Sequence, residues 1–184
     1  PGTALMMEFR TEINTGGLEP RIVYRTPILM MGSCFTDEVR RFLHNYLFPV
    51  TINPFGVIYN PASVKKNLEA LMDKKQYHGE ELEEYGGLWF SFDHYTKFSH
   101  PDKQTALEQI NRRFKEARES LNSTRFLIIT FGTAYLYRRK ENGEVVCNCH
   151  KIPATRFDRS LMEVEEIVGA YSELLRRIGE SYPE

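Results

Sequence analysis

The chain has 184 residues, of which 41% are hydrophobic, so it can build one substantial core but is too short for two full-sized domains. Its 24 lysines and arginines nearly balance its 25 aspartates and glutamates. Without a charge excess, neither a nucleic acid nor an anionic membrane is expected as its partner, and a neutral or modestly polar small molecule fits better.

The cysteines and the N-terminal residues bear on the compartment and on the domain limits. Three cysteines, an odd number, do not suit a disulfide framework. No stretch approaches the ~18 apolar residues of a membrane span, and no secretion signal is recognised, so a cytoplasmic location is expected. Pro1–Met6 stand before a second methionine and are interpreted as an artificial leader, which places a single domain at residues 7–184.

The first predicted unit is a strand, a sharp turn and a helix. Ile28–Met31 is continuously apolar, which is typical of a strand buried on both faces, and the run stops at Gly32-Ser33. Thr36 is predicted to cap the helix that follows, with acidic residues in the first turn. One face of this helix carries its apolar residues: Val39, Phe42, Leu43, Tyr46 and Leu47.

Strands and helices continue to alternate downstream. Phe48–Ile52 is predicted to form a second strand. Asn60-Pro61 predicts the start of a helix that runs to about Lys74, since asparagine is a common cap and proline suits the first helical position. A longer helix that begins near Asp102 leads into a third strand, Phe126–Phe131.

Two stretches break this alternation, and a last helix follows them. The aromatic-rich segment Tyr85–His100 contains paired glycines, which are typical of a hairpin turn. Tyr135–Arg138 and Val145–Asn148 flank an Asn-Gly pair, which is a strong hairpin signal. From Val164 to about Ile178, a continuous apolar stripe predicts the last helix.

The alternation predicts a three-layer α/β fold in which helices flank a parallel sheet. Only three core strands are recognised, and no strand follows the last helix, so the sheet is expected to be incomplete towards the C-terminus. Because an uncovered sheet edge invites pairing with another chain, a homodimer through this edge is one expected solution.

Ser33 is the first candidate for chemistry. It stands where a buried strand ends and a helix begins, which is the place where open α/β sheets bind their ligands. The helix N-terminus can stabilise an oxyanion there, and Gly32 permits a tight turn. The alternative is a serine that only caps the helix. Cys34 is a second candidate nucleophile, although a cysteine often serves as a small apolar residue.

Four short motifs resemble those of the GSCFA domain family and occur in the family's order. They are Gly32-Ser33-Cys34-Phe35, Asn53-Pro54-Phe55-Gly56, Ser91-Phe92-Asp93-His94 and Asn148-Cys149-His150-Lys151. The family is grouped with the SGNH, or GDSL-like, hydrolases. The resemblance therefore implies an SGNH-type, flavodoxin-like arrangement of the sheet and its helices.

The same resemblance implies roles for particular residues. Ser33 would be the nucleophile, and Gly56 and Asn148 would help to form the oxyanion hole. The loop after the third strand reads Gly132-Thr133-Ala134 where the superfamily has Gly-x-Asn, so Thr133 is an alternative donor. The SGNH base is the histidine of an Asp-x-x-His segment, and no Asp or Glu stands three positions before any histidine of this chain. We therefore expect a C-terminally truncated enzyme with little activity of its own.

Other polar residues of the motifs are candidates for substrate contact or an auxiliary role. His94 or His150 could act as a local base, because a base needs only hydrogen-bond reach, or each could be an ordinary loop histidine. Asn53 and Asp93 are candidates for substrate contact. Cys147-x-Cys149-His150 is a poor zinc pattern, since alternate strand residues point to opposite faces and no second pair completes the ligand set. Neither a metal nor a cofactor is expected.

Two kinds of function remain open from the sequence. The first is a serine esterase or deacylase acting on a small polar ester or an acylated carbohydrate. The second is a non-catalytic carbohydrate-binding or scaffold domain of SGNH shape, which the lost oxyanion asparagine favours.

Overall fold

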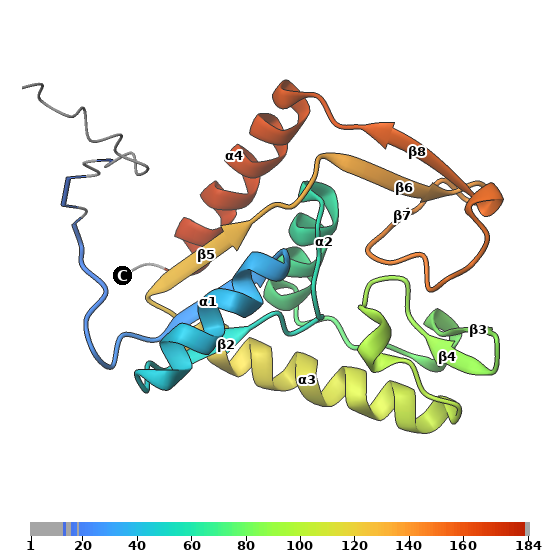
Figure 1. Cartoon of the computed structure of the whole chain (residues 1–184), viewed down its shortest axis with the longest axis horizontal. Helices are drawn as coiled ribbons and strands as arrows, with labels where there is room; N and C mark the ends of the chain where they lie inside the picture. Colours follow the sequence, from blue (N-terminus) through green and yellow to red (C-terminus); the bar gives the residue numbers. More distant parts are fainter. Residues whose placement is uncertain (1–12, 14–15, 18, 183–184) are drawn as a thin grey trace, which may run out of the picture.

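The structure is a computed structural model that describes residues 13, 16–17 and 19–182 (Figure 1). The predicted leader, Pro1–Met6, and the predicted domain start at residue 7 lie outside the described residues. Within them, strands and helices form a mixed α/β arrangement with a parallel sheet, as their alternation predicted. No helix in this part of the chain is long and apolar enough to cross a membrane.

β1 is the central strand of the parallel sheet. It spans Ile28–Gly32 and lies between β2 (Val50–Ile52) and β5 (Phe126–Thr130). Every residue of β1 is buried, as expected for a strand that is flanked by two others and covered on both faces. The register pairs Gly32 with Thr130, so the carboxyl ends of β1 and β5 lie side by side.

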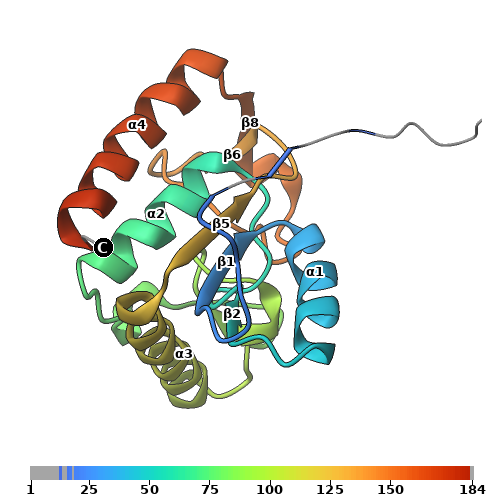
Figure 2. The same cartoon turned by 90° about the vertical axis from the view of Figure 1, so that its left-hand side faces the viewer.

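Helices cover both faces of this sheet (Figure 2). Successive side chains of a strand point to opposite faces, so the apolar residues of β1 make both faces of the sheet hydrophobic. The face that presents Ile28 and Met30 packs against α1 (Cys34–Asn45). The opposite face forms the larger core with α2 (Pro61–Met72) and α3 (Lys103–Ser123).

α4 (Val164–Ser181) packs mainly against α2, and the two helices lie side by side in Figure 2. Arg177 joins them through ion pairs of 2.9 Å with Glu69 and with Asp73. The stripe that predicted α4 is only partly buried: Leu174 is inaccessible to solvent, whereas Val164, Val168 and Leu175 are exposed.

The start of α1 differs from the prediction. Ser33 is the N-cap residue, whereas the predicted cap, Thr36, lies inside the first turn and is fully buried. The reason is that β1 continues through Gly32, so the chain turns at Ser33. Val39 and Leu43 pack against the sheet. The other apolar residues of the predicted stripe are exposed: Phe42, Tyr46 and Leu47.

The predicted starts of α2 and α3 are confirmed. Before α2, the side chain of Asn60 accepts a hydrogen bond from the N–H of Ser63 at 2.8 Å, and Pro61 occupies the first turn. Before α3, the side chain of Asp102 accepts the N–H of Thr105 at 2.8 Å. Both caps satisfy donors that a helix cannot pair by itself.

The aromatic-rich segment forms the predicted hairpin. β3 (Glu83–Tyr85) and β4 (Leu88–Phe90) pair antiparallel around Gly86 and Gly87, whose φ angles of 63° and 78° suit a tight hairpin turn. Short 3₁₀ helices flank the hairpin at Gly79–Glu81 and Thr96–Phe98.

A separate antiparallel sheet follows β5. Its central strand, β6 (Tyr135–Arg139), pairs with β7 (Val145–Val146), which confirms the second hairpin. It also pairs with β8 (Phe157–Leu161), which follows a 3₁₀ helix at Ala154–Arg156. β8 was not predicted because four of its five residues are exposed, so no pattern of buried apolar residues marks it.

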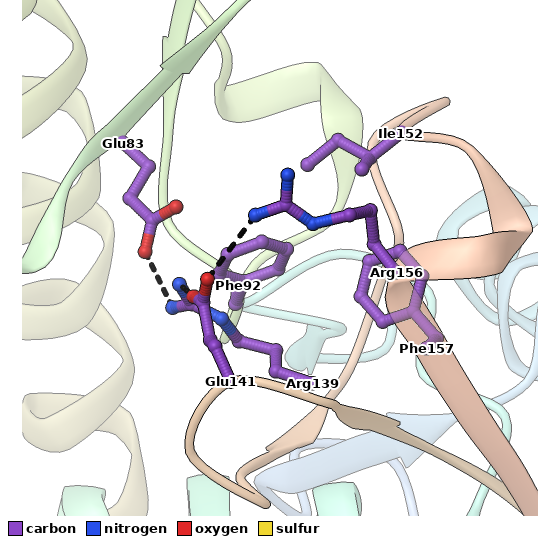
Figure 3. Close-up of a pocket in the computed structure, with 7 residues that line it drawn as sticks. All are labelled: Glu83, Phe92, Arg139, Glu141, Ile152, Arg156 and Phe157. Carbon is purple, nitrogen blue, oxygen red and sulfur yellow. Dashed lines mark hydrogen bonds and ion pairs between the residues drawn. The ribbon is translucent and has the colours of Figure 1, made fainter.

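Arg139, the last residue of β6, connects the antiparallel sheet to the β3–β4 hairpin (Figure 3). Its guanidinium forms ion pairs with Glu83 and Glu141 and lies 4.5 Å from the centroid of the Phe92 ring. Arg156 reaches Glu141 at 3.2 Å. The cavity between these side chains measures ≈ 30 Å³, which leaves room for about one or two water molecules. We interpret these ion pairs as a structural link between the antiparallel sheet and the β3–β4 hairpin.

Candidate functional site

Ser33 lies where β1 ends and α1 begins, as the sequence predicted. Its backbone is extended, with φ −71° and ψ 176°, and the residue is only 4% exposed. Its hydroxyl makes no capping bond to the helix, so it does not serve as the ordinary helix cap that was the alternative interpretation. Its Oγ lies instead 3.1 Å from Oγ1 of Thr130.

Thr130 is a site residue that the sequence analysis missed. Besides contacting Ser33 Oγ, its Oγ1 accepts the N–H of Ser33 at 3.0 Å and lies 2.7 Å from Oγ1 of Thr36. Its position in the sequence could have suggested a role, because Thr130 is a polar residue at the carboxyl end of a strand, where open parallel sheets bind their ligands. Sequence alone could not place that strand beside β1.

Gly32 is the residue that allows this close approach. Its φ is +137°, which side chains of L-residues rarely permit. A Cβ at this position would lie 1.9 Å from the carbonyl oxygen of Thr130 and 2.6 Å from its Oγ1. Glycine therefore lets β1 and β5 meet closely just before the serine.

Asn53 holds the turn before Ser33 from the side of β2. Its Oδ1 accepts the N–H of Gly32 at 2.9 Å, and its Nδ2 donates to Oδ1 of Asp37 at 2.9 Å. The residue is 2% exposed and has a φ of +41°, a conformation that asparagine tolerates better than most residues. Asn53 thus lies beside the candidate nucleophile and ties the turn to α1.

The backbone donors around Ser33 differ in whether they are already paired. The N–H of Gly56 donates to the carbonyl of Asn53 at 2.8 Å, and that of Thr133 donates to the carbonyl of Tyr59 at 3.1 Å. The hydroxyl of Thr133 accepts the N–H of Tyr135, at the start of β6.

Two neighbouring donors of α1 are free by comparison. Among the described residues, none accepts a hydrogen bond from the N–H of Cys34 or of Phe35. Both belong to the first turn of α1, where the aligned peptide dipoles create a positive potential. This end of the helix can therefore stabilise a negative charge that develops near Ser33.

Tyr59 and the loop after β5 form the surroundings of Ser33. A Cβ at Gly132 would lie 2.8 Å from Cδ1 of Tyr59 and 3.3 Å from Cβ of Ser33. Tyr59 is 40% exposed, and burial together with the nearby Cys34 raises the pKa of its phenol. The side chain of Tyr59 and Ser33 therefore both lie next to Gly132, and sequence reasoning did not find Tyr59 as a neighbour.

His94 belongs to an aromatic cluster. Its ring centroid lies 5.2 Å from that of Phe55, 4.8 Å from that of Tyr77 and 5.3 Å from that of Phe98. Burial lowers the pKa of His94 to about 3, and neighbouring cationic groups act in the same direction. Its Nδ1 has no hydrogen-bond partner among the described residues. The structure thus presents His94 as a neutral core residue.

His150 is stacked on the ring of Phe90, with the centroids 4.0 Å apart, and its Nε2 lies 3.1 Å from the carbonyl oxygen of Ser91. Burial lowers its pKa to about 4, although this hydrogen bond opposes the shift. The side-chain oxygen of Asn148 accepts the N–H of His150 at 2.7 Å in a local turn. These contacts join the last two sequence motifs to each other.

Asp93 faces a separate polar cavity. Its carboxylate lies 2.5 Å from Nζ of Lys66, 3.9 Å from Nζ of Lys75 and 3.3 Å from the hydroxyl of Tyr77. Burial favours a neutral Lys66, but Asp93 outweighs it and raises the lysine pKa. The cavity measures ≈ 350 Å³ and Ser91 also lines it. The predicted site residues therefore fall into two groups, one around Ser33 and one around Asp93.

The thiols of the weak zinc pattern are both protonated groups at neutral pH. Burial raises the pKa of Cys147 to about 12 and also raises that of Cys149. The Sγ of Cys147 accepts a hydrogen bond from Nδ2 of Asn67 at 3.6 Å, and its N–H donates to the carbonyl of Phe92. Cys147 therefore packs between α2 and the aromatic segment.

The fold and the site define a class of protein: a mixed α/β domain whose central parallel strand ends in Gly-Ser at the start of a helix. The model of the GSCFA family matches residues 27–184, so the chain belongs to the GSCFA family. The match includes all four motifs that suggested this family from the sequence. Comparisons with curated proteins and with solved structures gave no match.

Proposed function

We propose that this GSCFA protein is a serine hydrolase of the SGNH type that cleaves a small polar ester or an acylated carbohydrate, with Ser33 as nucleophile. One observation carries the proposal: the Ser33 hydroxyl lies at the carboxyl end of the central strand and at a helix start, yet makes no capping bond. It is instead held by Thr130. Its near-complete burial favours a preorganised hydroxyl over an ordinary surface serine.

The proposed reaction is acyl transfer through Ser33. Ser33 Oγ forms a bond to the carbonyl carbon while a histidine base takes its proton, and the carbonyl π electrons move to the oxygen. When the carbonyl re-forms, the bond to the leaving alcohol breaks and the alcohol oxygen takes the proton from the histidine. Water then repeats these steps on the acyl-serine, which releases the acid and restores Ser33.

The N–H groups of Cys34 and Phe35, which have no acceptor among the described residues, are available to donate hydrogen bonds to the negative oxygen of the intermediate. The N–H of Ser33 and that of Gly56 would have to give up their present acceptors to serve there. The sequence-based assignment of Gly56 and Asn148 to the oxyanion hole stays a prediction.

The base in this proposal is the histidine of an Asp-x-x-His segment, as the SGNH resemblance implies. His94 and His150 are poor candidates, because both rings are buried against aromatic side chains and have depressed pKa values. The printed sequence holds no Asp or Glu three positions before a histidine. The proposal therefore takes the base from outside these 184 residues and expects little turnover from them alone.

A non-catalytic carbohydrate-binding domain is the second candidate function. It is favoured by Gly132-Thr133-Ala134, which lacks the asparagine expected for the oxyanion hole. The polar cavity of ≈ 350 Å³ beside Asp93 is also large enough for a small sugar. In this alternative, Ser33 would have no enhanced reactivity.

The two candidates differ in what Ser33→Ala should do to the full-length gene product. We expect the variant to hydrolyse p-nitrophenyl acetate at least ~100-fold more slowly, because the nucleophile is removed. A fluorophosphonate should label the unaltered protein at Ser33, as located by peptide mass spectrometry. Ser123→Ala, on the exposed end of α3, is the matched control. Equal hydrolysis by both variants and no labelling would refute the catalytic proposal and favour the binding domain.

A further inference from the structure

Three groups converge on one oxygen atom next to the candidate nucleophile. Thr130 Oγ1 lies 3.0 Å from the N–H nitrogen of Ser33, 3.1 Å from Ser33 Oγ and 2.7 Å from Thr36 Oγ1. A hydroxyl has one proton to donate and can accept two hydrogen bonds. Three partners therefore use the full capacity of Thr130, and one of the bonds must be a donation.

The burial of Thr36 decides which bond is the donation. Thr36 is fully buried, and Thr130 is the partner of its hydroxyl in the described part of the chain. If Thr130 donated to Thr36, the proton of Thr36 would be buried without an acceptor, which is unfavourable. Thr36 therefore donates to Thr130. Since Thr130 also accepts the N–H of Ser33, its own proton goes to Ser33 Oγ.

We propose that Thr130 is a positioning residue for Ser33, holding one lone pair of Ser33 Oγ by donating a hydrogen bond to it. The inference rests on the proposed hydrolase function and deepens it. With one lone pair held, the proton of Ser33 must point away from Thr130, where a base can take it. The second lone pair stays free to attack. The order of donation is then Thr36 to Thr130 to Ser33.

The surrounding backbone keeps this arrangement in place. Gly32 and Thr130 are register partners, and the absence of a side chain at Gly32 leaves space for Oγ1 of Thr130. On the other side, Asn53 binds the N–H of Gly32 at 2.9 Å. Thr130 of β5 therefore holds Ser33 directly, and Asn53, after β2, holds it through Gly32. These contacts restrict the rotation of the Ser33 side chain.

The test compares Thr130→Ala with Thr130→Ser in the full-length gene product. Thr130→Ala removes the hydroxyl and should lower kcat for p-nitrophenyl acetate about tenfold, the effect of one lost hydrogen bond, with KM changed less than about twofold. Thr130→Ser keeps the hydroxyl and should restore most of kcat. The rate of fluorophosphonate labelling of Ser33 should follow the same order. A general loss of structure would not produce this split or this rescue.

Two controls separate the possible failures. Thr124→Ala removes a hydroxyl at the C-terminal end of α3, just before β5, where it donates to the carbonyl of Ser120, and should leave kcat unchanged. Thermal unfolding shows which variants fold; should Thr130→Ala not fold, Thr130→Val removes the hydroxyl while keeping a branched side chain.

The outcomes distinguish this inference from the function on which it rests. Ser33 labelling that is equally fast or faster without the Thr130 hydroxyl overturns the positioning role while the hydrolase proposal stands. An unaltered protein that neither hydrolyses the ester nor labels at Ser33 overturns the hydrolase proposal itself, and the positioning role falls with it.

Discussion

Ser33 and Thr130 are 97 positions apart in the chain, yet their hydroxyl groups touch. The contact arises because β1 and β5 are parallel neighbours in register, which brings their carboxyl ends to the same edge of the sheet. The motif around Ser33 was recognisable in the sequence. Its partner was not, since a threonine at the end of an apolar strand is common and has no motif of its own.

Gly32 allows a direct prediction about the backbone at this edge. Gly32→Ala should lower the free energy of unfolding by roughly 3 kcal/mol or more, because it combines an unfavourable φ with a clash against Thr130. Urea denaturation followed by circular dichroism measures the change.

Gly143→Ala is the matched control for Gly32→Ala. Gly143 also has a positive φ, of 74°, but a Cβ there would meet nothing within 4 Å. It should therefore show the conformational penalty alone, about 1–2 kcal/mol. Similar losses in both variants would mean that the close approach of Thr130 is not important for stability.

At the scale of elements, helix caps were easier to predict than helix surfaces. Asn60 and Asp102 act as caps because each residue's own side chain reaches the first turn of its helix. The stripes of α1 and α4 predicted helices correctly but overstated burial, since Phe42 and Val168 remain exposed. An apolar stripe indicates a helix, whereas its burial depends on which neighbours are present.

Asn60→Ala tests how much one cap contributes. The variant leaves the N–H of Ser63 without its acceptor at a position where Asn60 is only 4% exposed. We expect a loss of about 1–2 kcal/mol and a lower Tm by roughly 2–7 °C, measured by calorimetry. Asn60→Ser keeps an acceptor and should retain most of the stability. An unchanged Tm in Asn60→Ala would show that the cap is dispensable.

At the scale of the whole molecule, the parallel sheet ends at β5 in the described part of the chain, since β5 is the last strand in the order β2-β1-β5. A homodimer through this edge stays a prediction. The antiparallel sheet of β6, β7 and β8 and the β3–β4 hairpin form a second region, tied together by Arg139. His94 packs against Phe55, Tyr77 and Phe98 of the larger core, whereas His150 stacks on Phe90 of the hairpin.

These two histidines make the stability of the molecule depend on pH. Their pKa values fall from an ordinary 6.5 to about 3 for His94 and about 4 for His150. Below pH 6.5 the unfolded chain takes up protons that the folded protein excludes, so stability is full above this pH and declines as the pH falls towards about 4 for His150 and about 3 for His94. Between pH 7 and pH 5 we expect a loss of about 2 kcal/mol for each histidine.

His94→Phe should remove about half of this loss, because phenylalanine fits among the same rings and binds no proton. Urea denaturation at pH 7 and pH 5 gives the two free energies. His44→Phe, at an exposed position of α1, controls for the removal of any one histidine. An equal decline in His94→Phe and in the unaltered protein would contradict the assignment to His94.

Local sequence features were sufficient for the strand–turn–helix unit at Ser33, for the caps at Asn60 and Asp102, for both hairpins and for membership of the GSCFA family. Their causes act over a few residues, through hydrogen-bonding side chains, glycine turns and apolar periodicity. The tertiary structure decided what these features could not: that Thr130 meets Ser33, that Gly32 makes space for it, and that His94 and His150 are buried against aromatic rings. Such contacts depend on strand order and register, which bring residues distant in the chain together without leaving a local pattern.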